Sequence, residues 1–122
     1  MATESKKVLL IEDDLRHIND WEEELKDDGY DVTYVESIPA ARTLLEQDGR
    51  WDAIVFDGCI GGDDFNSPPL IKAFRAKMGE GCRMIAASSN PDLSKLMMDA
   101  GCTHMVMKKN HVPGMVHSLL RA

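Results

Sequence analysis

Five polar residues stand directly after apolar runs of this 122-residue chain: Glu12, Asp13, Asp57, Ser88 and Lys108. Carboxylate oxygens bind hard divalent cations, and a carboxylate can also attack phosphorus. A bound cation and an ammonium group stabilise the charge of a transferred phosphoryl group, to which a hydroxyl can donate a hydrogen bond. Together, these residue types could bind a divalent cation and accept a phosphoryl group.

Asp57 closes the run Trp51–Phe56, which suits a strand buried on both faces of a sheet. Gly58 then gives the chain conformational freedom. Taken alone, Asp57 favours a simpler interpretation, in which the side chain only ends a strand and caps a turn. A chemical role therefore depends on whether the fold brings the other polar residues to it.

The apolar runs are too short to be convincing helices and have the character of buried strands. The expected strands are Val8–Ile11, Asp31–Val35, Trp51–Phe56, Met84–Ala87 and Thr103–Met107. Apolar residues recur at helical spacing in the segments between them. The expected helices begin at Leu15, after the capping residue Ser37 and at Ser67, and then span Asp92–Ala100 and Val112–Leu120.

Five strands that alternate with five helices predict a doubly wound α/β fold with a parallel sheet, in one domain across residues 1–122. Ligand sites of such sheets lie at the carboxyl ends of the strands. If the strand order is 2-1-3-4-5, as in flavodoxin-like folds, the first and third strands are neighbours. Glu12, Asp13 and Asp57 then converge, and a divalent cation relieves their mutual repulsion.

The formal net charge of −7 disfavours nucleic acid as a partner, because phosphate contacts need clustered Lys and Arg. No apolar stretch is long enough to span a membrane, and the first residues lack the apolar centre of a signal peptide. We therefore expect a cytoplasmic protein. Its three cysteines lack metal-ligand spacing and predict neither a disulfide framework nor a zinc site.

The whole chain resembles a receiver domain of the response regulators of two-component signalling, of the single-domain chemotaxis type. Four motifs carry the resemblance, and their order and separations match the family: Ile11–Asp14, Val55–Asp57, Ala86–Ser89, and Ala100-Gly101 leading to Val106–Lys108. The resemblance implies that Asp57 is the phosphoacceptor. It also implies that Glu12, Asp13, Asp57 and the backbone carbonyl of Cys59 hold Mg²⁺ or Mn²⁺.

By the same resemblance, Ser88 is the switch hydroxyl and Lys108 contacts the phosphoryl group. The chain departs from the family in the loop of residues 60–65 and at Met105, where an aromatic switch residue is usual. Lys109 replaces a proline that normally follows the lysine through a cis peptide. A cis bond before a non-proline residue costs about 2.5–4 kcal/mol, so we expect a trans bond and a different loop around Lys108.

The resemblance implies a phosphoacceptor module that receives its phosphoryl group from a histidine kinase or a phosphotransfer protein. Such a module is not an enzyme beyond self-phosphorylation from small donors and autodephosphorylation. A receiver-like interaction module that is never phosphorylated is an alternative, for which Gly61, Met105 and Lys109 are the evidence. A Mg²⁺-dependent phosphatase is a third, although Cys59 stands where such enzymes commonly carry a second acid.

The chain ends just after the fifth expected helix, so we expect no output domain. We also expect a monomer or weak dimer. A downstream protein would then read a change of shape on the face of the fourth helix, fifth strand and fifth helix. Met105 could fill space that Ser88 vacates on moving toward the phosphoryl group, because methionine adapts its shape readily. Met105 could equally be ordinary filler, and both interpretations stay open.

Overall fold

The five apolar runs form the strands of one parallel sheet in the computed structural model, which describes residues 5–47, 49–61 and 66–121. The strands are β1 (Lys7–Ile11), β2 (Asp31–Val35), β3 (Ala53–Asp57), β4 (Arg83–Ala87) and β5 (His104–Val106). The helices are α1 (Leu15–Asp27), α2 (Ile38–Glu46), α3 (Ser67–Met78), α4 (Pro91–Ala100) and α5 (Val112–Leu120), and a 3₁₀ turn, η1 (Lys109–His111), precedes α5. None of the described helices has the length and apolar composition that a bilayer crossing requires.

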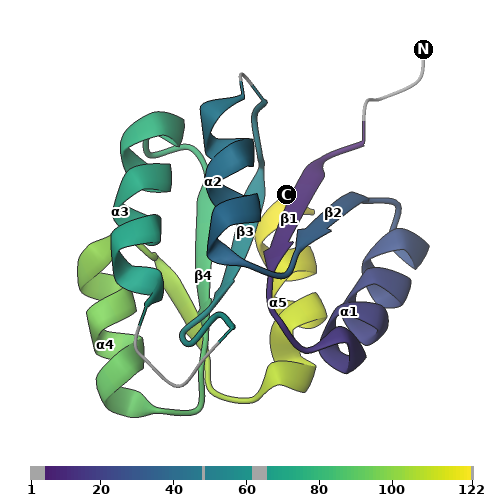
Figure 1. The fold of residues 1–122 in the computed structure, drawn as a ribbon. Helices are drawn as coiled ribbons and strands as arrows, with labels where there is room; N and C mark the ends of the chain where they lie inside the picture. The colour runs from purple at the N-terminus through teal and green to yellow at the C-terminus, as the bar shows by residue number, and fades with distance from the viewer. Residues whose placement is uncertain (1–4, 48, 62–65, 122) are drawn as a thin grey trace.

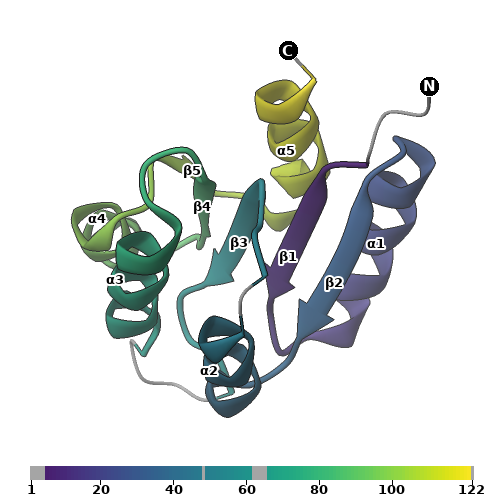
Figure 2. The same cartoon turned by 90° about the horizontal axis from the view of Figure 1, so that it is seen from above.

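The strand order is β2-β1-β3-β4-β5, which confirms the predicted doubly wound topology (Figures 1 and 2). β1 and β3 are hydrogen-bonded neighbours, with Ile11 opposite Phe56. Asp57 lies opposite Ala87 of β4. This register brings the ends of β1, β3 and β4 level, so the residues that follow them share one edge of the sheet.

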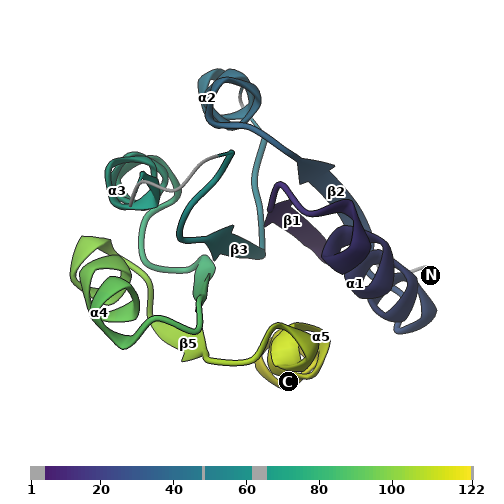
Figure 3. The same ribbon diagram turned by 60° about the horizontal axis from the view of Figure 1, so that its bottom comes forward.

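Helices cover both faces of the sheet: α1 and α5 lie on one side and α2, α3 and α4 on the other (Figure 3). A hydrophobic core lies on each face of the sheet, and successive residues of a strand point alternately into one core and the other. Leu9 of β1 packs in a cluster with Phe74 of α3, whereas Leu10 packs with Trp21 of α1 and Val116 of α5. Because strands such as β1 and β3 are buried on both faces, they are continuous apolar runs rather than alternating ones.

Short polar side chains fix the helix starts. Asp14 caps α1, Ser37 caps α2 as predicted, and Asn90 caps α4 by accepting from two backbone N–H groups. Asn66 precedes α3, but its side chain bonds to Ile60 instead of capping the helix. It accepts a hydrogen bond from the backbone N–H of Ile60 at 2.8 Å and donates one to the Ile60 carbonyl at 2.7 Å. Asn66 thereby joins the start of α3 to the segment that follows β3.

The structure corrects several predicted boundaries by one or two residues: β1, β4 and α4 each begin one residue earlier than predicted, and β3 ends at Asp57. β3 begins at Ala53 rather than Trp51, and β5 spans only His104–Val106 rather than Thr103–Met107. β5 is an edge strand that pairs with β4 alone, and β4 ends at Ala87, opposite Val106. Because Ala87 and Val106 are the last pair, no residue of β4 is left to pair with Met107. The chain therefore leaves the sheet after Val106.

Helix α4 presses on the backbone just beyond β3. A Cβ atom at Gly58 would lie 2.1 Å from Cδ2 and 2.8 Å from Cγ of Leu93. Leu93 is only 2% exposed, so it has little room to move aside. The residue after Asp57 must therefore be glycine for α4 to lie this close to the sheet edge.

We predict that Gly58→Ala lowers the free energy of unfolding by about 1–3 kcal/mol, the usual cost of overpacking a core. Gly114→Ala is the matched control, because a Cβ at Gly114 of α5 meets no described atom within 4 Å. That change should raise stability by up to about 1 kcal/mol, the difference in helix propensity. Urea denaturation measures the free energy of unfolding of both variants. A Gly58→Ala protein as stable as the wild type would contradict the close packing of α4 on Gly58.

Candidate functional site

Three carboxylates meet at the edge of the sheet where β1 and β3 end. One oxygen from each of Glu12, Asp13 and Asp57 lies within 4.8 Å of the others, as the predicted strand order required. Glu12 is 1% and Asp57 9% exposed, whereas Asp13 is open to solvent. The cluster is therefore buried at Glu12 and Asp57 and accessible to solvent at Asp13.

Backbone N–H groups orient each of these side chains. The N–H of Asp14 donates to Glu12 Oε1 at 3.2 Å, and that of Gly58 donates to Asp57 Oδ1 at 2.9 Å. The N–H of Gly61 donates to Asp13 Oδ2 at 3.1 Å. Each donor lies in the loop after β1 or β3, so the same loops carry the acids and fix them.

A lysine side chain enters the cluster, and it is Lys109. Its Nζ lies 2.6 Å from Glu12 Oε2 and 3.0 Å from Asp57 Oδ1. Lys108 is exposed and lines a groove between β5 and α5. The prediction that Lys108 is the lysine beside the acids is therefore wrong in its placement, and its neighbour lies there instead.

The backbone explains this correction. No cis peptide bond occurs in the described part of the chain, so the predicted trans bond between Lys108 and Lys109 is confirmed. Lys108 has an extended backbone, with φ −119° and ψ 125°, after which the chain turns into η1. Because successive side chains of an extended chain point to opposite sides, Lys108 faces solvent when Lys109 faces the acids.

Burial dominates the electrostatics of the site. It raises the pKa of Glu12 to about 7, although the hydrogen bond from Lys109 opposes the shift. Burial likewise raises the pKa of Asp57, against the attraction of Lys109. Burial alone would lower the pKa of Lys109, but its bond to Glu12 and the charge of Asp57 raise it. The ammonium group therefore stays charged, while Glu12 and Asp57 hold protons more tightly than usual.

The donor set fits a hard divalent cation. All three side chains offer carboxylate oxygens, which Mg²⁺ and Ca²⁺ prefer, and Asp13 leaves one side open. Mg²⁺ usually takes one or two protein carboxylates and fills its remaining positions with waters or phosphate oxygens. The cluster is therefore able to hold a cation and still leave room for a phosphoryl group.

Ser88 lies close to this edge, and Cys59 and Met105 complete the predicted set. Ser88 is 8% exposed, its backbone N–H donates to the Val106 carbonyl at 3.2 Å, and its Oγ accepts from the Asn90 N–H at 3.2 Å. Cys59 is half-buried two residues beyond Asp57. Met105 is 47% exposed and so fills no internal space in this state. The roles predicted for Ser88, Cys59 and Met105 stay predictions.

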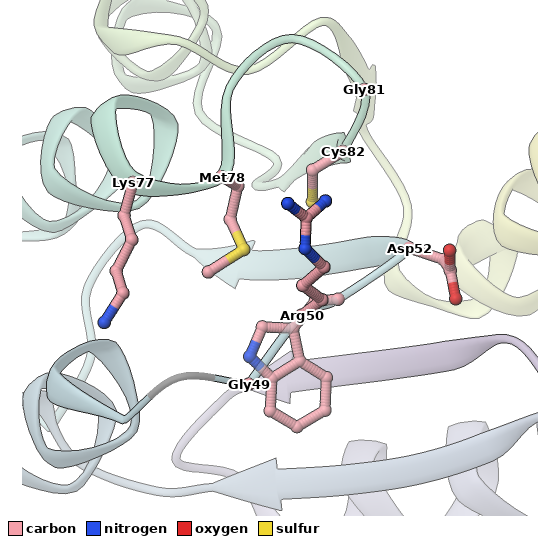
Figure 4. Close-up of a pocket in the computed structure, with 8 residues that line it drawn as sticks. Gly49, Arg50, Asp52, Lys77, Met78, Gly81 and Cys82 are labelled. Carbon is pink, nitrogen blue, oxygen red and sulfur yellow. The ribbon is translucent and has the colours of Figure 1, made fainter.

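A cavity that was not predicted lies at the opposite end of the sheet, beside the residues that precede β3 and β4 (Figure 4). It has a volume of about 340 Å³ and is lined by residues such as Arg50, Lys77, Met78 and Cys82. Lys77 Nζ donates to the carbonyls of Leu45 and Gln47 at the end of α2, so it already has partners. None of the predicted site residues lies there.

We predict that the free energy of unfolding falls as the pH rises from about 4.5 to about 7 when divalent cations are removed by a chelator. The pKa of Glu12 is about 7 in the folded protein against an ordinary 4.5, so the folded state binds more protons in this range. This contribution is complete below pH 4.5 and is lost as the pH passes 7. It amounts to on the order of 3 kcal/mol at most.

Urea denaturation across this pH range checks the prediction. Glu12→Gln should flatten the pH dependence, because the amide does not titrate. Glu80→Gln serves as the control, since Glu80 is exposed and lies just before β4, at the other end of the sheet. An unchanged slope in Glu12→Gln would contradict the assignment to Glu12.

No protein-family model matches the chain, and no curated protein matches it either. Many solved structures do, and they share the fold at low sequence identity, as three examples illustrate. A response regulator from Burkholderia pseudomallei, solved with a phosphorylated aspartic acid, a calcium ion and citrate, superposes with a TM-score of 0.81 at 18% identity. The match covers 94% of this chain and 66% of the Burkholderia chain, so this chain spans slightly less than two thirds of it.

Two further structures match over nearly their whole length. The receiver domain of a sensor histidine kinase from Pseudomonas aeruginosa, with a magnesium ion in its active-site cleft, has a TM-score of 0.74 at 24% identity and covers 98% of this chain and 100% of its own. A phosphorylated cyanobacterial phytochrome response regulator has a TM-score of 0.80 at 20% identity, over 96% and 95% of the two chains. The chain therefore has the fold of the response-regulator receiver domains.

Proposed function

We propose that this chain is a phosphoacceptor module of a two-component or phosphorelay system, and that Asp57 receives the phosphoryl group. The observation that carries the proposal is the convergence of Asp57 with Glu12, Asp13 and the Lys109 ammonium group. Two structures with the same fold are phosphorylated, one of them on an aspartic acid. The donor would be a histidine kinase or a histidine phosphotransfer protein.

In the proposed transfer, an oxygen of Asp57 forms a bond to phosphorus while the bond from phosphorus to the donor's imidazole nitrogen breaks. The imidazole leaves with the electron pair and takes up a proton from solvent. The Lys109 ammonium, 3.0 Å from Asp57, would stabilise the negative charge on the phosphoryl oxygens. Ser88 would donate a hydrogen bond to one of those oxygens, as the resemblance implies.

The metal is part of this proposal. Glu12, Asp13 and Asp57 would hold Mg²⁺ or Mn²⁺, and the backbone carbonyl of Cys59 would add a neutral oxygen ligand. A bound divalent cation would supply positive charge to the phosphoryl oxygens during transfer. The structural neighbours from Pseudomonas and Burkholderia contain magnesium and calcium ions respectively.

The alternative is a receiver-like interaction module that is never phosphorylated. One observation favours it: the Lys109 ammonium already neutralises part of the charge of Glu12 and Asp57, so the fold does not depend on a metal or a phosphoryl group to balance them. A phosphatase acting on external substrates is the third candidate. Cys59 argues against it, because that position lacks the second acid such enzymes commonly use.

We predict that Mg²⁺ and acetyl phosphate produce a single labile phosphoryl adduct, visible by intact mass. Asp57→Asn should abolish the adduct and keep the fold, because asparagine preserves size and lacks the nucleophile. Asp13→Asn should slow labelling by weakening metal binding, whereas Asp52→Asn, at the other end of β3, should leave labelling unchanged. Labelling that persists in Asp57→Asn would contradict the assignment, and no adduct in the wild type would favour the interaction module.

We further propose that a downstream protein reads the face of α4, β5 and α5. A groove of about 770 Å³ lies along the β5 and α5 part of this face, and its lining includes Met105, Met107, Lys108 and Met115. Met105 and Met107 are 47% and 38% exposed, and exposed methionines suit an adaptable binding surface. A cytoplasmic location and a monomeric or weakly dimeric state complete the proposal.

Backbone amide NMR with and without a phosphoryl mimic tests this output face. We predict shifts across residues 92–120 in the wild type and none in Asp57→Asn, which cannot form the phosphoryl state. Shifts that stay confined to the loop after Asp57 would exclude this route of signal output.

A further inference from the structure

Two identical side chains stand next to each other in the loop after β5, and only one enters the acid cluster. Lys109 contacts Glu12 and Asp57 and its side chain is 24% exposed, whereas Lys108 is exposed. Because both are lysines of the same length and charge, side-chain chemistry does not choose between them. Because successive side chains of an extended backbone point to opposite sides, turning this backbone over would exchange the places of Lys109 and Lys108. The choice is therefore made by whatever holds the backbone of this loop.

One long-range hydrogen bond holds it. The indole N–H of Trp21, on the buried face of α1, donates to the backbone carbonyl of Lys109 at 2.8 Å. The N–H of His111 donates to the carbonyl of Lys108 at 3.0 Å, and the N–H of Val112 donates to the carbonyl of Lys109. Both bonds are local and close the turn whichever way the turn faces. Trp21 fixes the orientation of the loop relative to α1.

The indole ring is itself held in place, so its N–H is a fixed donor. Trp21 is 2% exposed and packs in the core cluster that contains Leu25 and Val112. Its outer side stacks on the imidazole ring of His17, with the centroids 5.6 Å apart and the planes 18° from parallel. A donor fixed in this way can position the carbonyl to which it bonds.

We propose that Trp21 is a positioning residue that selects Lys109 over Lys108 as the lysine of the acid cluster. Trp21 acts through the backbone of Lys109 and touches neither the acids nor a phosphoryl group. The consequence for phosphoryl transfer rests on the proposed function. The placement of the two lysines does not, so the two statements are tested separately.

Amine modification tests the placement directly. The folded protein is acetylated briefly with an N-hydroxysuccinimide ester, which reacts with the uncharged amine, and is then cleaved with cyanogen bromide after methionine. Cleavage after Met107 and Met115 gives one peptide, residues 108–115, that contains both Lys108 and Lys109. Fragment ions of this peptide give the ratio of modification at the two lysines, and the unfolded protein gives the intrinsic ratio.

The wild-type protein should be modified at Lys108 far more than at Lys109. Trp21→Phe removes the N–H and keeps an aromatic ring, so the ratio should move toward the unfolded value by roughly three- to tenfold, the effect of one net hydrogen bond. The chain's other tryptophan is a matched control, because Trp51 Nε1 is buried with no hydrogen-bond partner among the described residues. Trp51→Phe should leave the ratio unchanged.

A ratio in Trp21→Phe equal to the wild-type value would overturn the proposal, as would an equal fall in Trp51→Phe. If circular dichroism shows that Trp21→Phe does not fold, 3-benzothienylalanine at position 21 replaces it. That residue keeps both rings and exchanges the N–H for sulfur. If the Lys108-to-Lys109 modification ratio of this variant falls as predicted for Trp21→Phe, the proposal is supported. If the ratio equals that of the wild type, the proposal is overturned.

The rate of labelling by acetyl phosphate tests the consequence for transfer. Trp21→Phe should slow labelling several-fold, and it should add nothing in a Lys109→Gln background, because the tryptophan acts only through that lysine. An equal slowing in both backgrounds would show that Trp21 is merely structural and would overturn this step. If the wild type accepts no phosphoryl group at all, the proposed function fails while the modification ratio still decides the role of Trp21.

Discussion

The repulsion among three carboxylates is the constraint on which the site depends. Burial of Glu12 and Asp57 would make two adjacent negative charges costly, and the Lys109 ammonium between them offsets that cost. Removing one member of such a buried set leaves an uncompensated charge, so the acids and the lysine belong together energetically. The loops after β1, β3 and β5 are coupled through these contacts, although they lie far apart in the sequence.

The sheet provides the rigid frame for this charge balance. β1 and β3 are fully hydrogen-bonded neighbours whose residues pack on both faces, so their carboxyl ends cannot move independently. The lysine arrives from β5, a three-residue edge strand with one partner. The acids are therefore held by the central strands, which are the most constrained part of the fold. Their counter-charge, Lys109, follows an edge strand that is held on one side only. The hydrogen bond from Trp21 to the Lys109 carbonyl attaches the loop after β5 to α1.

Much of this arrangement could be predicted from the sequence, because each strand is a continuous apolar run that ends at a chemically distinct residue. The topology, the convergence of Glu12, Asp13 and Asp57, and the trans bond before Lys109 followed from such patterns and from the resemblance. The choice of Lys109 over Lys108 could not, because it depends on a hydrogen bond from Trp21, far away in the chain. The only local signal was the missing proline, which predicted a changed loop without saying which lysine the change would favour.

The segment between β1 and α1 has no spare residue. Glu12 lies inside with the lysine, Asp13 faces the open side, and Asp14 caps the helix that begins at the next residue. Three consecutive acids of nearly equal chemistry thus perform three incompatible tasks, distinguished only by their order along the backbone. Insertion or deletion of a single residue here would move an acid out of its place relative to the strand or the helix, so the length of this stretch is as constrained as its side chains.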